Sequence, residues 1–349
     1  MLPKIPNEVF DCAESGRSSE LGSFELCQDQ QFGFYFNSEY QSVDYDSDRY
    51  QNEQAHSSIF VRHLQVVAQE ICSRFGKNSS VVEVGCGKGY FFGILSDLNF
   101  TDLRGFDKTY SGDDPRIAKR YLTSSDMPLY ADVLVLRHVL EHVQQPHEFL
   151  RELAKINGKS CSFVIEVPST DWIIYNSTFW DFTYEHVNYF TSASFYKMFD
   201  VCEVNEVFND QYLLAISESD SLINRLNNES RKSALFNKMI REHIERNSLF
   251  DFATKQAGRY WIWGGATKGV LILHHLLGFI NGSPARPPLG IVDINPAKQN
   301  KFAAGTGIQI FSTDSFLSLL KDYDKIFVAN PAYELEVLKF MEVSSSKKV

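Results

Sequence analysis

A glycine-rich turn between a buried strand and a helix constrains the fold of this chain more than any other feature. The run 79–84 carries one carboxylate, Glu83, and is followed by Gly85, Gly87 and Gly89 at alternate positions, with a helix expected at 90–98. Glycines in this pattern allow a tight turn and let a ligand approach the backbone closely. The spacing differs from the G-x-G-x-x-G of dinucleotide-binding folds. The segment therefore predicts an α/β domain with a ligand bound at this turn.

Strand and helix patterns alternate on both sides of this turn. Strands are expected at 79–84, 103–106, 133–136 and 162–167, and helices at 54–74 and 147–156. Such alternation is typical of a mostly parallel sheet covered by helices. A second pattern of the same kind begins at 260, with strands at 260–263, 289–293 and 325–329. We therefore expect an irregular N-terminal arm (1–50), an α/β domain (51–218), a helical connector (219–257) and a second α/β domain (258–349).

Composition narrows the possible partners and the compartment. The 349 residues carry 34 basic and 44 acidic side chains, a net charge of −10, which argues against a nucleic-acid partner. There is no apolar run of membrane-spanning length and no signal-peptide pattern, so we expect a cytoplasmic protein without a membrane partner. Oligomeric state is left open. The six cysteines form no CxxC pair, and no bound metal is expected.

The glycine-rich turn resembles the cofactor turn of class I S-adenosylmethionine (SAM) methyltransferases, and SAM is the cofactor that this resemblance implies. Glu83 would meet an ammonium group, and Asp107, at the end of the next strand, would accept hydrogen bonds from both ribose hydroxyls. Gln54 would contact the SAM carboxylate. The segment 137–143 follows the fourth strand and is similar to the N-x-L-x-H segment of these enzymes. His138 would contact SAM. His142 is the better candidate for chemistry because histidine titrates near neutrality, although both histidines could instead close the turn.

A denser polar cluster follows the fifth strand. Tyr184, Glu185, His186 and Tyr189 bring together two phenols, a carboxylate and an imidazole. Such a set can remove a proton, orient the base and stabilise an oxyanion. The alternative is an aromatic-rich packing segment. The adjacent Glu-His pair after a strand end favours an active-site role.

Three segments carry a closer resemblance. Glu166-Val167-Pro168 precedes 183–189, which is similar to a Y-H-E-H-x-x-Y motif. Residues 263–269 are similar to Y-G-A-x-x-K-G, and Asp293-Ile294-Asn295-Pro296-Ala297-Lys298-Gln299, with the G-T-x-I at 305–308, is similar to the D-x-N-P-x-K-Q…G-T-x-I pattern. These motifs, in this order over residues 45–342, resemble the SAM-dependent C-methyltransferases of nucleotide-linked deoxysugars. The chain departs from that family in lacking its four-cysteine zinc minidomain and in having Thr183 and Tyr184 where the family has Tyr and His.

The resemblance implies C-methylation of a nucleotide-linked keto-deoxysugar between the two α/β domains. His186, aligned by Glu185, would remove the proton beside the ketone, and His142 and Tyr184 would stabilise the enolate. Tyr189, Lys268 and Asn295 would bind the substrate, Lys268 by holding a phosphate beside the glycine turn, unless this lysine only closes the turn. Two alternatives remain open at this point: methylation of an oxygen or nitrogen, and a non-catalytic SAM-fold scaffold.

Overall fold

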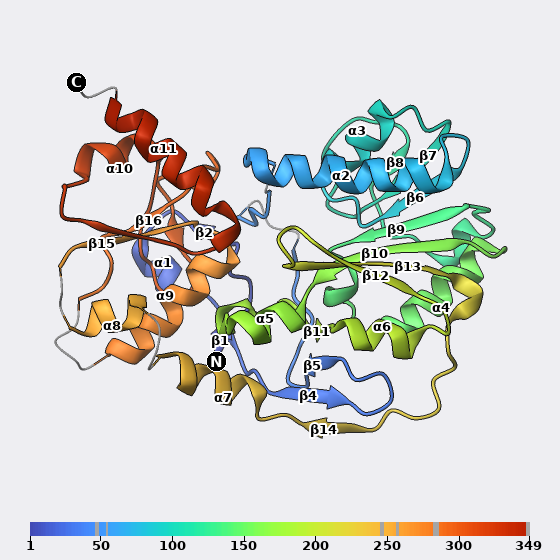
Figure 1. Ribbon diagram of the computed structural model, residues 1–349, viewed down its shortest axis with the longest axis horizontal. Coiled ribbons are helices and arrows are strands. Elements are labelled where there is room, and N and C mark those ends of the chain that lie inside the picture. Colours follow the sequence, from blue (N-terminus) through green and yellow to red (C-terminus); the bar gives the residue numbers. More distant parts are fainter. Residues whose placement is uncertain (46–48, 54, 245–247, 256–257, 282–285, 347–349) are drawn as a thin grey trace.

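The computed structural model describes residues 1–45, 49–53, 55–244, 248–255, 258–281 and 286–346. Two α/β units lie side by side, and the N-terminal residues, drawn in blue, run beneath the first unit and reach into the second (Figure 1). The first unit carries the glycine-rich turn. The second contains the C-terminal residues, drawn in orange and red.

The first unit is built on a seven-stranded sheet in the order β12-β13-β10-β9-β6-β7-β8. Its strands are β6 (Ser80–Val84), β7 (Asp102–Phe106), β8 (Ile117–Ala118), β9 (Val133–Arg137), β10 (Ser162–Pro168), β12 (Glu203–Val207) and β13 (Tyr212–Glu218). The five strands from β10 to β8 are parallel, and β13 is antiparallel to β10 and β12. This order, with one antiparallel strand next to the edge, is the class I SAM-methyltransferase fold, as predicted.

Helices cover both faces of that sheet because its central strands are apolar throughout. Val133 and Val135 of β9 pack toward α2 (Ser58–Phe75) and α3 (Tyr90–Asp97), whereas Leu134 and Leu136 pack toward α4 (Pro146–Asn157). Successive strand residues point to opposite faces, so a continuous apolar run is buried on both sides. The remaining helices of this unit, α5 (Thr170–Asn176) and α6 (Ser192–Met198), follow β10.

The C-terminal unit confirms the second predicted α/β pattern. Its sheet is all parallel, in the order β18-β16-β15-β19. These strands are β15 (Tyr260–Trp263), β16 (Ile291–Val292), β18 (Ile310–Phe311) and β19 (Lys325–Val328), and the helices are α9 (Thr267–Ile280), α10 (Thr313–Leu319) and α11 (Glu334–Ser346). None of the helices in the described residues combines the length and the apolar character needed to cross a bilayer.

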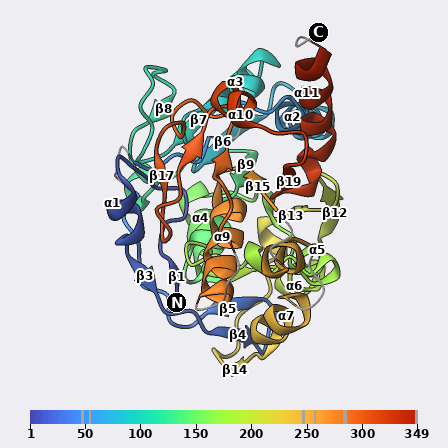
Figure 2. The same cartoon turned by 90° about the vertical axis from the view of Figure 1, so that its left-hand side faces the viewer.

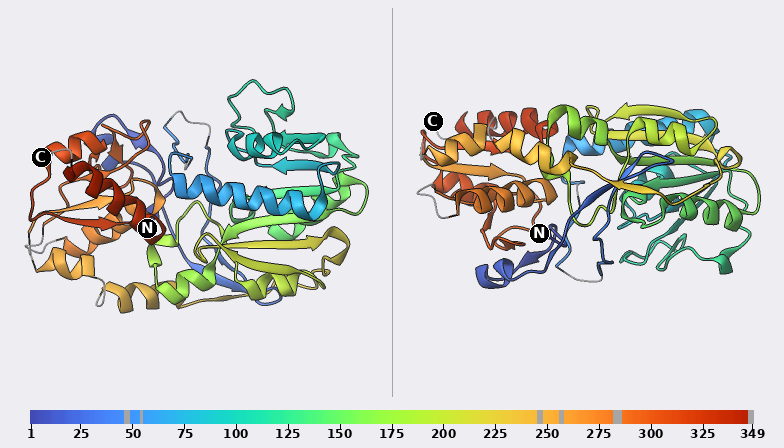
Figure 3. Two further views of the ribbon diagram at one scale, coloured as in Figure 1. Left: turned by 45° about the horizontal axis from the view of Figure 1, so that its top comes forward. Right: turned by 90° about the horizontal axis from the view of Figure 1, so that it is seen from below.

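Residues 1–50, predicted to be an irregular arm, instead add short strands to both units. β1 (Leu2–Pro3) pairs with β3 (Leu21–Gly22), and β2 (Val9–Phe10) pairs with β17 (Phe302–Ala303) of the C-terminal unit. β4 (Leu26–Asp29) and β5 (Tyr35–Asn37) lie between β14 (Ser230–Lys232) and β11 (Asn188–Tyr189) in a four-stranded sheet. The helix α1 (Ala13–Arg17) packs beside β17 (Figure 2), and the N-terminal chain crosses from one unit to the other (Figure 3). Strands this short leave no periodic signal in the sequence.

The predicted helical connector is helical only in its second half. The stretch after Glu218 begins with a single 3₁₀ turn (Ser219–Ser221) and then contributes β14. Helices α7 (Leu235–Ile244) and α8 (Ser248–Thr254) follow. The Asn and Ser residues within 224–230 favour an extended chain over a helix, because their short polar side chains compete for backbone hydrogen bonds.

Two glycines of α9 provide a matched test of the C-terminal packing. A Cβ at Gly269 would lie 1.8 Å from the backbone oxygen of Gly264, whereas a Cβ at Gly278 would meet nothing within 4 Å. We expect Gly269→Ala to lower the free energy of unfolding by about 1–3 kcal/mol. Gly278→Ala, in an exposed helix interior, should raise it by about 0.5–1 kcal/mol. Chemical denaturation measures both changes, and equal effects would contradict the close approach at Gly269.

Candidate active site

The glycine-rich turn requires glycine for two different reasons. Gly85, Gly87 and Gly89 have φ values of +75°, +55° and +80°, which side chains adopt rarely. A Cβ at Gly85 would lie 2.4 Å from a methyl group of Val139, so the Val139 side chain leaves no room for a side chain there. A Cβ at Gly87 would meet nothing within 4 Å. The turn therefore keeps open space beside Gly87, where a ligand can approach the backbone.

Asp107 lies at this turn, as predicted, and also shapes it. Its Oδ2 accepts a hydrogen bond from the Gly87 N–H at 2.7 Å, and its Oδ1 accepts from both the N–H and the hydroxyl of Thr109 at 2.7 Å. Each carboxylate oxygen has two lone pairs, so Oδ2 retains one for a ribose hydroxyl.

Glu83 is buried at the end of β6, with 2% of its surface exposed. Its Oε2 has no hydrogen-bond partner within the described residues. Burial, reinforced by Asp107 and opposed by Arg137, raises the pKa of Glu83 to about 7. A buried unpartnered carboxylate is costly, and a cationic ligand group would remove that cost. The ammonium of SAM fits this requirement. Gln54, a further predicted cofactor contact, lies outside the described residues.

A cavity of about 340 Å³ lies between the two units, and its wall comes from both of them and from Asn7 of the N-terminal segment. Six of the predicted site residues line it: His138, His142, Glu185, His186, Lys268 and Asn295. The glycine-rich turn does not, so the structure separates a cofactor region from a substrate-sized cavity. His138, Glu141 and His142 follow β9, at the carboxyl edge of the sheet where ligands of open α/β folds bind.

Tyr184 and Tyr189 do not reach the cavity, which corrects two of the predicted roles. Tyr184 is 1% exposed, and its hydroxyl accepts a hydrogen bond from the Gln41 N–H at 2.8 Å. The Tyr189 hydroxyl donates to the backbone oxygen of Thr183 at 2.6 Å. Both rings belong to the hydrophobic core. For these two residues the packing alternative holds, because a buried phenol needs both an apolar surrounding and one hydrogen-bond partner.

Glu185 points toward the C-terminal unit and not toward His186. Its Oε1 accepts hydrogen bonds from the Thr267 hydroxyl at 3.1 Å and from the Asn7 amide at 3.5 Å. The second oxygen, Oε2, is buried, and no donor in the described part of the chain reaches it. Burial raises the pKa of Glu185. The predicted alignment of His186 by Glu185 is therefore absent, since donors of the C-terminal turn draw the carboxylate away.

His142 and His186 meet edge to face, with ring centroids 4.9 Å apart. His142 Nδ1 lies 2.8 Å from the backbone oxygen of Glu185 and 3.3 Å from the Tyr45 hydroxyl. Burial, together with the nearby His142, lowers the pKa of His186 to about 3. The His186 imidazole is therefore neutral near pH 7 and, on this value, a weak proton acceptor.

His138 is held as a cation by two carboxylates. Its Nδ1 and Nε2 each lie 3.1 Å from a carboxylate oxygen, of Glu141 and Glu166 respectively. Burial opposes the charge, but these two hydrogen bonds outweigh it and raise the pKa of His138 to about 9. Glu166 also binds Arg137 and His63. Glu141 and Glu166 are not among the predicted site residues, although both stand in the segments 137–143 and 166–168 that carry predicted motifs.

Both lysines that line the cavity already bind other groups of the protein. Lys268 forms an ion pair with Asp181, and its ammonium lies 5.0 Å from the Trp172 ring centre. Lys298 is buried and donates to Asn7 Oδ1 at 3.0 Å and to the Gly265 carbonyl at 3.2 Å. Lys268 is thus not the free phosphate-binding cation that the motif predicted. Nothing in the sequence pattern around Asn7 indicated its role.

The C-terminal turn repeats the geometry of the first one. Asp293 Oδ2 accepts from the Gly265 N–H at 2.6 Å, and Oδ1 accepts from the Asn295 N–H at 2.7 Å. Asp107 makes the same two kinds of contact in the first unit. The Asn295 side-chain nitrogen is buried, lines the cavity and finds no acceptor among the described residues. Asn295 therefore has a donor available for a ligand.

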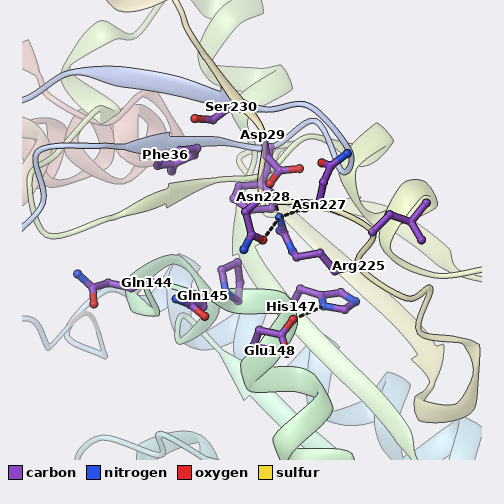
Figure 4. A pocket seen from close by; sticks show the side chains of 13 residues that line it. Asp29, Phe36, Gln144, Gln145, His147, Glu148, Arg225, Asn227, Asn228 and Ser230 are labelled. Atoms are coloured by element: carbon purple, nitrogen blue, oxygen red, sulfur yellow. Dashed lines mark hydrogen bonds and ion pairs between the residues drawn. The ribbon is translucent and has the colours of Figure 1, made fainter.

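A larger pocket, of about 620 Å³, lies elsewhere and contains none of the predicted site residues (Figure 4). Its buried ion pair is complete, since Arg225 pairs with Asp29 at 2.9 Å, and His147 Nε2 lies 2.6 Å from the Ile223 carbonyl oxygen. Chemistry-bearing groups with unpartnered atoms gather instead in the cavity between the units, which is why we place the active site there.

A protein-family comparison matches the α/β unit that carries the glycine-rich turn. Residues 60–201 match a family described as "Methyltransferase domain". No curated protein matches at a significant level.

Solved structures similar to this chain include a SAM-dependent methyltransferase from Archaeoglobus fulgidus. It shows 16% identity and a TM-score of 0.33, over 46% of this chain and 100% of that chain. The 1,6-didemethyltoxoflavin-N1-methyltransferase of Burkholderia thailandensis shows 10% identity and a TM-score of 0.34, over 53% of this chain and 95% of that chain. Magnesium protoporphyrin IX methyltransferase from Synechocystis PCC 6803 shows 15% identity and a TM-score of 0.35, over 48% and 87%. At these TM-scores the solved structures assign neither a substrate nor a reaction to this chain.

The strand order, the open glycine turn and the unpartnered Glu83 agree with the family match over 60–201. The first α/β unit of this chain therefore has the class I SAM-methyltransferase fold, and S-adenosyl-L-methionine is its cofactor.

Proposed function

We propose that the protein transfers the SAM methyl group to a small molecule held in the cavity between its two α/β units. The observation that carries this proposal is Glu185. Its carboxylate lines the cavity, and one of its oxygens is buried without a partner in the described residues. A carboxylate held in this way can accept a proton from the atom to be methylated. When bound, SAM supplies an electrophilic methyl group on a positively charged sulfur and leaves as S-adenosylhomocysteine.

The chain's own residues account for binding and proton removal. Glu83 and Asp107 would hold the ammonium and the ribose, and the open backbone at Gly87 would face the cofactor. Asn7 and Thr267 hold Oε1 of Glu185, which leaves Oε2 as the proton acceptor. Because Oε1 is held by these two donors and the Glu185 side chain is buried, the base is positioned before the substrate arrives.

We propose more specifically that the accepting atom is a carbon beside a ketone in a nucleotide-linked deoxysugar. Two features support this substrate class: the motif resemblance over both units, and the second glycine turn with Asp293 and Asn295 at the cavity wall. The nucleotide would lie at that turn, with the Asn295 amide donating to it. Glu185 would take the proton from carbon, and the resulting enolate carbon would attack the methyl group. This assignment replaces His186 as the base, because Glu185 has the free oxygen and the raised pKa.

Gly87 and Gly93 offer a matched test of the cofactor turn. Gly93 lies on the exposed side of α3, and a Cβ there would also meet nothing within 4 Å, but only Gly87 has a positive φ at the turn. Gly87→Ala should weaken S-adenosylhomocysteine binding by about tenfold or more, because the methyl group strains the turn and occupies the ligand's approach. Gly93→Ala should leave affinity unchanged. Isothermal titration calorimetry measures both, and equal affinities for the two variants would exclude this turn as the cofactor site.

Removal of the proposed base should affect turnover far more than cofactor binding. Glu185→Gln keeps the hydrogen-bonding shape but cannot accept the proton, so we expect kcat to fall at least about 100-fold. S-adenosylhomocysteine affinity should stay within about twofold, because Glu185 lies outside the cofactor turn. His186→Gln provides the comparison. If it lost turnover while Glu185→Gln retained it, the base would be His186.

Solvent-deuterium exchange distinguishes carbon methylation from transfer to oxygen or nitrogen. Protein with S-adenosylhomocysteine and a nucleoside diphosphate 4-keto-6-deoxysugar in deuterated water should introduce deuterium beside the ketone, and Glu185→Gln should not. With SAM, the product should carry a new C-methyl group detectable by mass spectrometry and NMR. Methyl transfer to a hydroxyl or amine without exchange would favour the O- or N-methyltransferase alternative. Failure to bind S-adenosylhomocysteine would favour a scaffold.

A further inference from the structure

We propose that Glu141, His142 and His186 bind a divalent transition-metal ion in the wall of the cavity. Glu141 and His142 belong to the 3₁₀ turn Leu140–His142 that follows β9, whereas His186 comes from the loop before β11. The fold brings one potential ligand atom of each residue within 4.8 Å of the other two. All three residues line the cavity.

Each of the three side chains keeps at least one oxygen or nitrogen atom that could bind a metal. Glu141 accepts from His138 through Oε1 at 3.1 Å, and its Oε2 is buried without a partner in the part of the chain that the structure describes. His142 uses Nδ1 toward the Glu185 carbonyl at 2.8 Å, which leaves Nε2 for a metal. Metal-binding histidines usually donate their other N–H to a carbonyl or carboxylate in this manner, because that bond fixes the tautomer.

The charge around the cavity also favours a cation. Three cationic groups line it, Lys268, Lys298 and His138, and each is already bound to protein groups. Six carboxylates line the same cavity: Glu53, Glu141, Asp181, Glu185, Asp293 and Glu336. Such a wall attracts a divalent ion and opposes a bare diphosphate. A bound ion would make the cavity more compatible with the anionic substrate of the proposed function.

The ligand chemistry selects the class of ion. Two imidazoles and one carboxylate suit zinc, cobalt or iron(II) and not magnesium or calcium, which prefer oxygen. Three protein ligands leave at least one coordination position open, and that position would face the cavity. If the proposed function holds, a ketone or hydroxyl oxygen of the substrate would occupy it. The binding of the metal itself does not depend on that function.

Cobalt(II) alone is a suitable probe, because its visible absorption reports coordination without turnover. Tag-free protein is treated with a chelator and titrated with cobalt(II) chloride, and zinc is then added. We expect saturable binding of one ion per chain, with visible bands of a four- or five-coordinate site that zinc abolishes by competition. Absence of these bands, or binding without saturation, would overturn the proposal.

Three variants locate the site. His186→Ala and Glu141→Gln should each weaken cobalt binding by about 10-fold to 100-fold, because each removes a ligand or its charge. His56→Ala is the control, since this exposed histidine lines the same cavity outside the cluster, and cobalt affinity should not change. S-adenosylhomocysteine binding, measured on every variant, separates loss of the metal from loss of the fold. A loss of cobalt affinity in His56→Ala, or an unchanged cobalt affinity in His186→Ala, would reject the assignment. A protein that binds cobalt but methylates nothing would leave the site standing and reject only the proposed function.

Discussion

A buried hydrogen-bond network among Asn7, Glu185, Thr267 and Lys298 joins the three parts of this protein. Asn7 comes from the N-terminal segment, Glu185 from the methyltransferase domain, and Thr267 and Lys298 from the C-terminal unit. Each of these polar groups would be costly to bury alone, so they satisfy one another only when all three parts are docked. The cavity exists because of that docking, and the orientation of Glu185 follows from it.

The side chains that line the cavity differ in charge and pKa, and therefore in the chemistry they can perform. His138 is held as a cation between two carboxylates, so it supports the geometry of Glu141 instead of exchanging protons. Glu185 keeps one free oxygen and has a raised pKa, which are the properties of a base. Potential ligand atoms of His142, His186 and Glu141 lie within 4.8 Å of one another. In the proposed function, these properties suit Glu185 to proton removal and the two histidines to stabilisation of negative charge on a substrate oxygen.

Much of the fold could be predicted because its signals are local. The apolar strands before Gly85 and Gly264, the turn glycines and Asp107 all lie within short segments whose chemistry is readable in order. The short N-terminal strands could not be predicted, since two-residue pairs such as Val9–Phe10 show no periodicity and are stabilised by partners nearly three hundred residues away. The helical spacing of apolar residues in the connector does not show that Ser230–Lys232 pair with β4, because that pairing depends on a strand about two hundred residues away.

For the site, the sequence by itself determined which chemical groups are present: the glycines and acids of the turn, and the carboxylate and imidazoles after two strand ends. Only the tertiary structure decided which of them face the cavity. Tyr184 and Tyr189 stand within four positions of Glu185 and His186, yet their rings lie in the core while the other two reach the cavity. Side-chain direction in an irregular segment depends on distant partners, here Gln41 for Tyr184 and Thr267 for Glu185. The tertiary structure also places Glu141 near His186 and pairs Lys268 with Asp181.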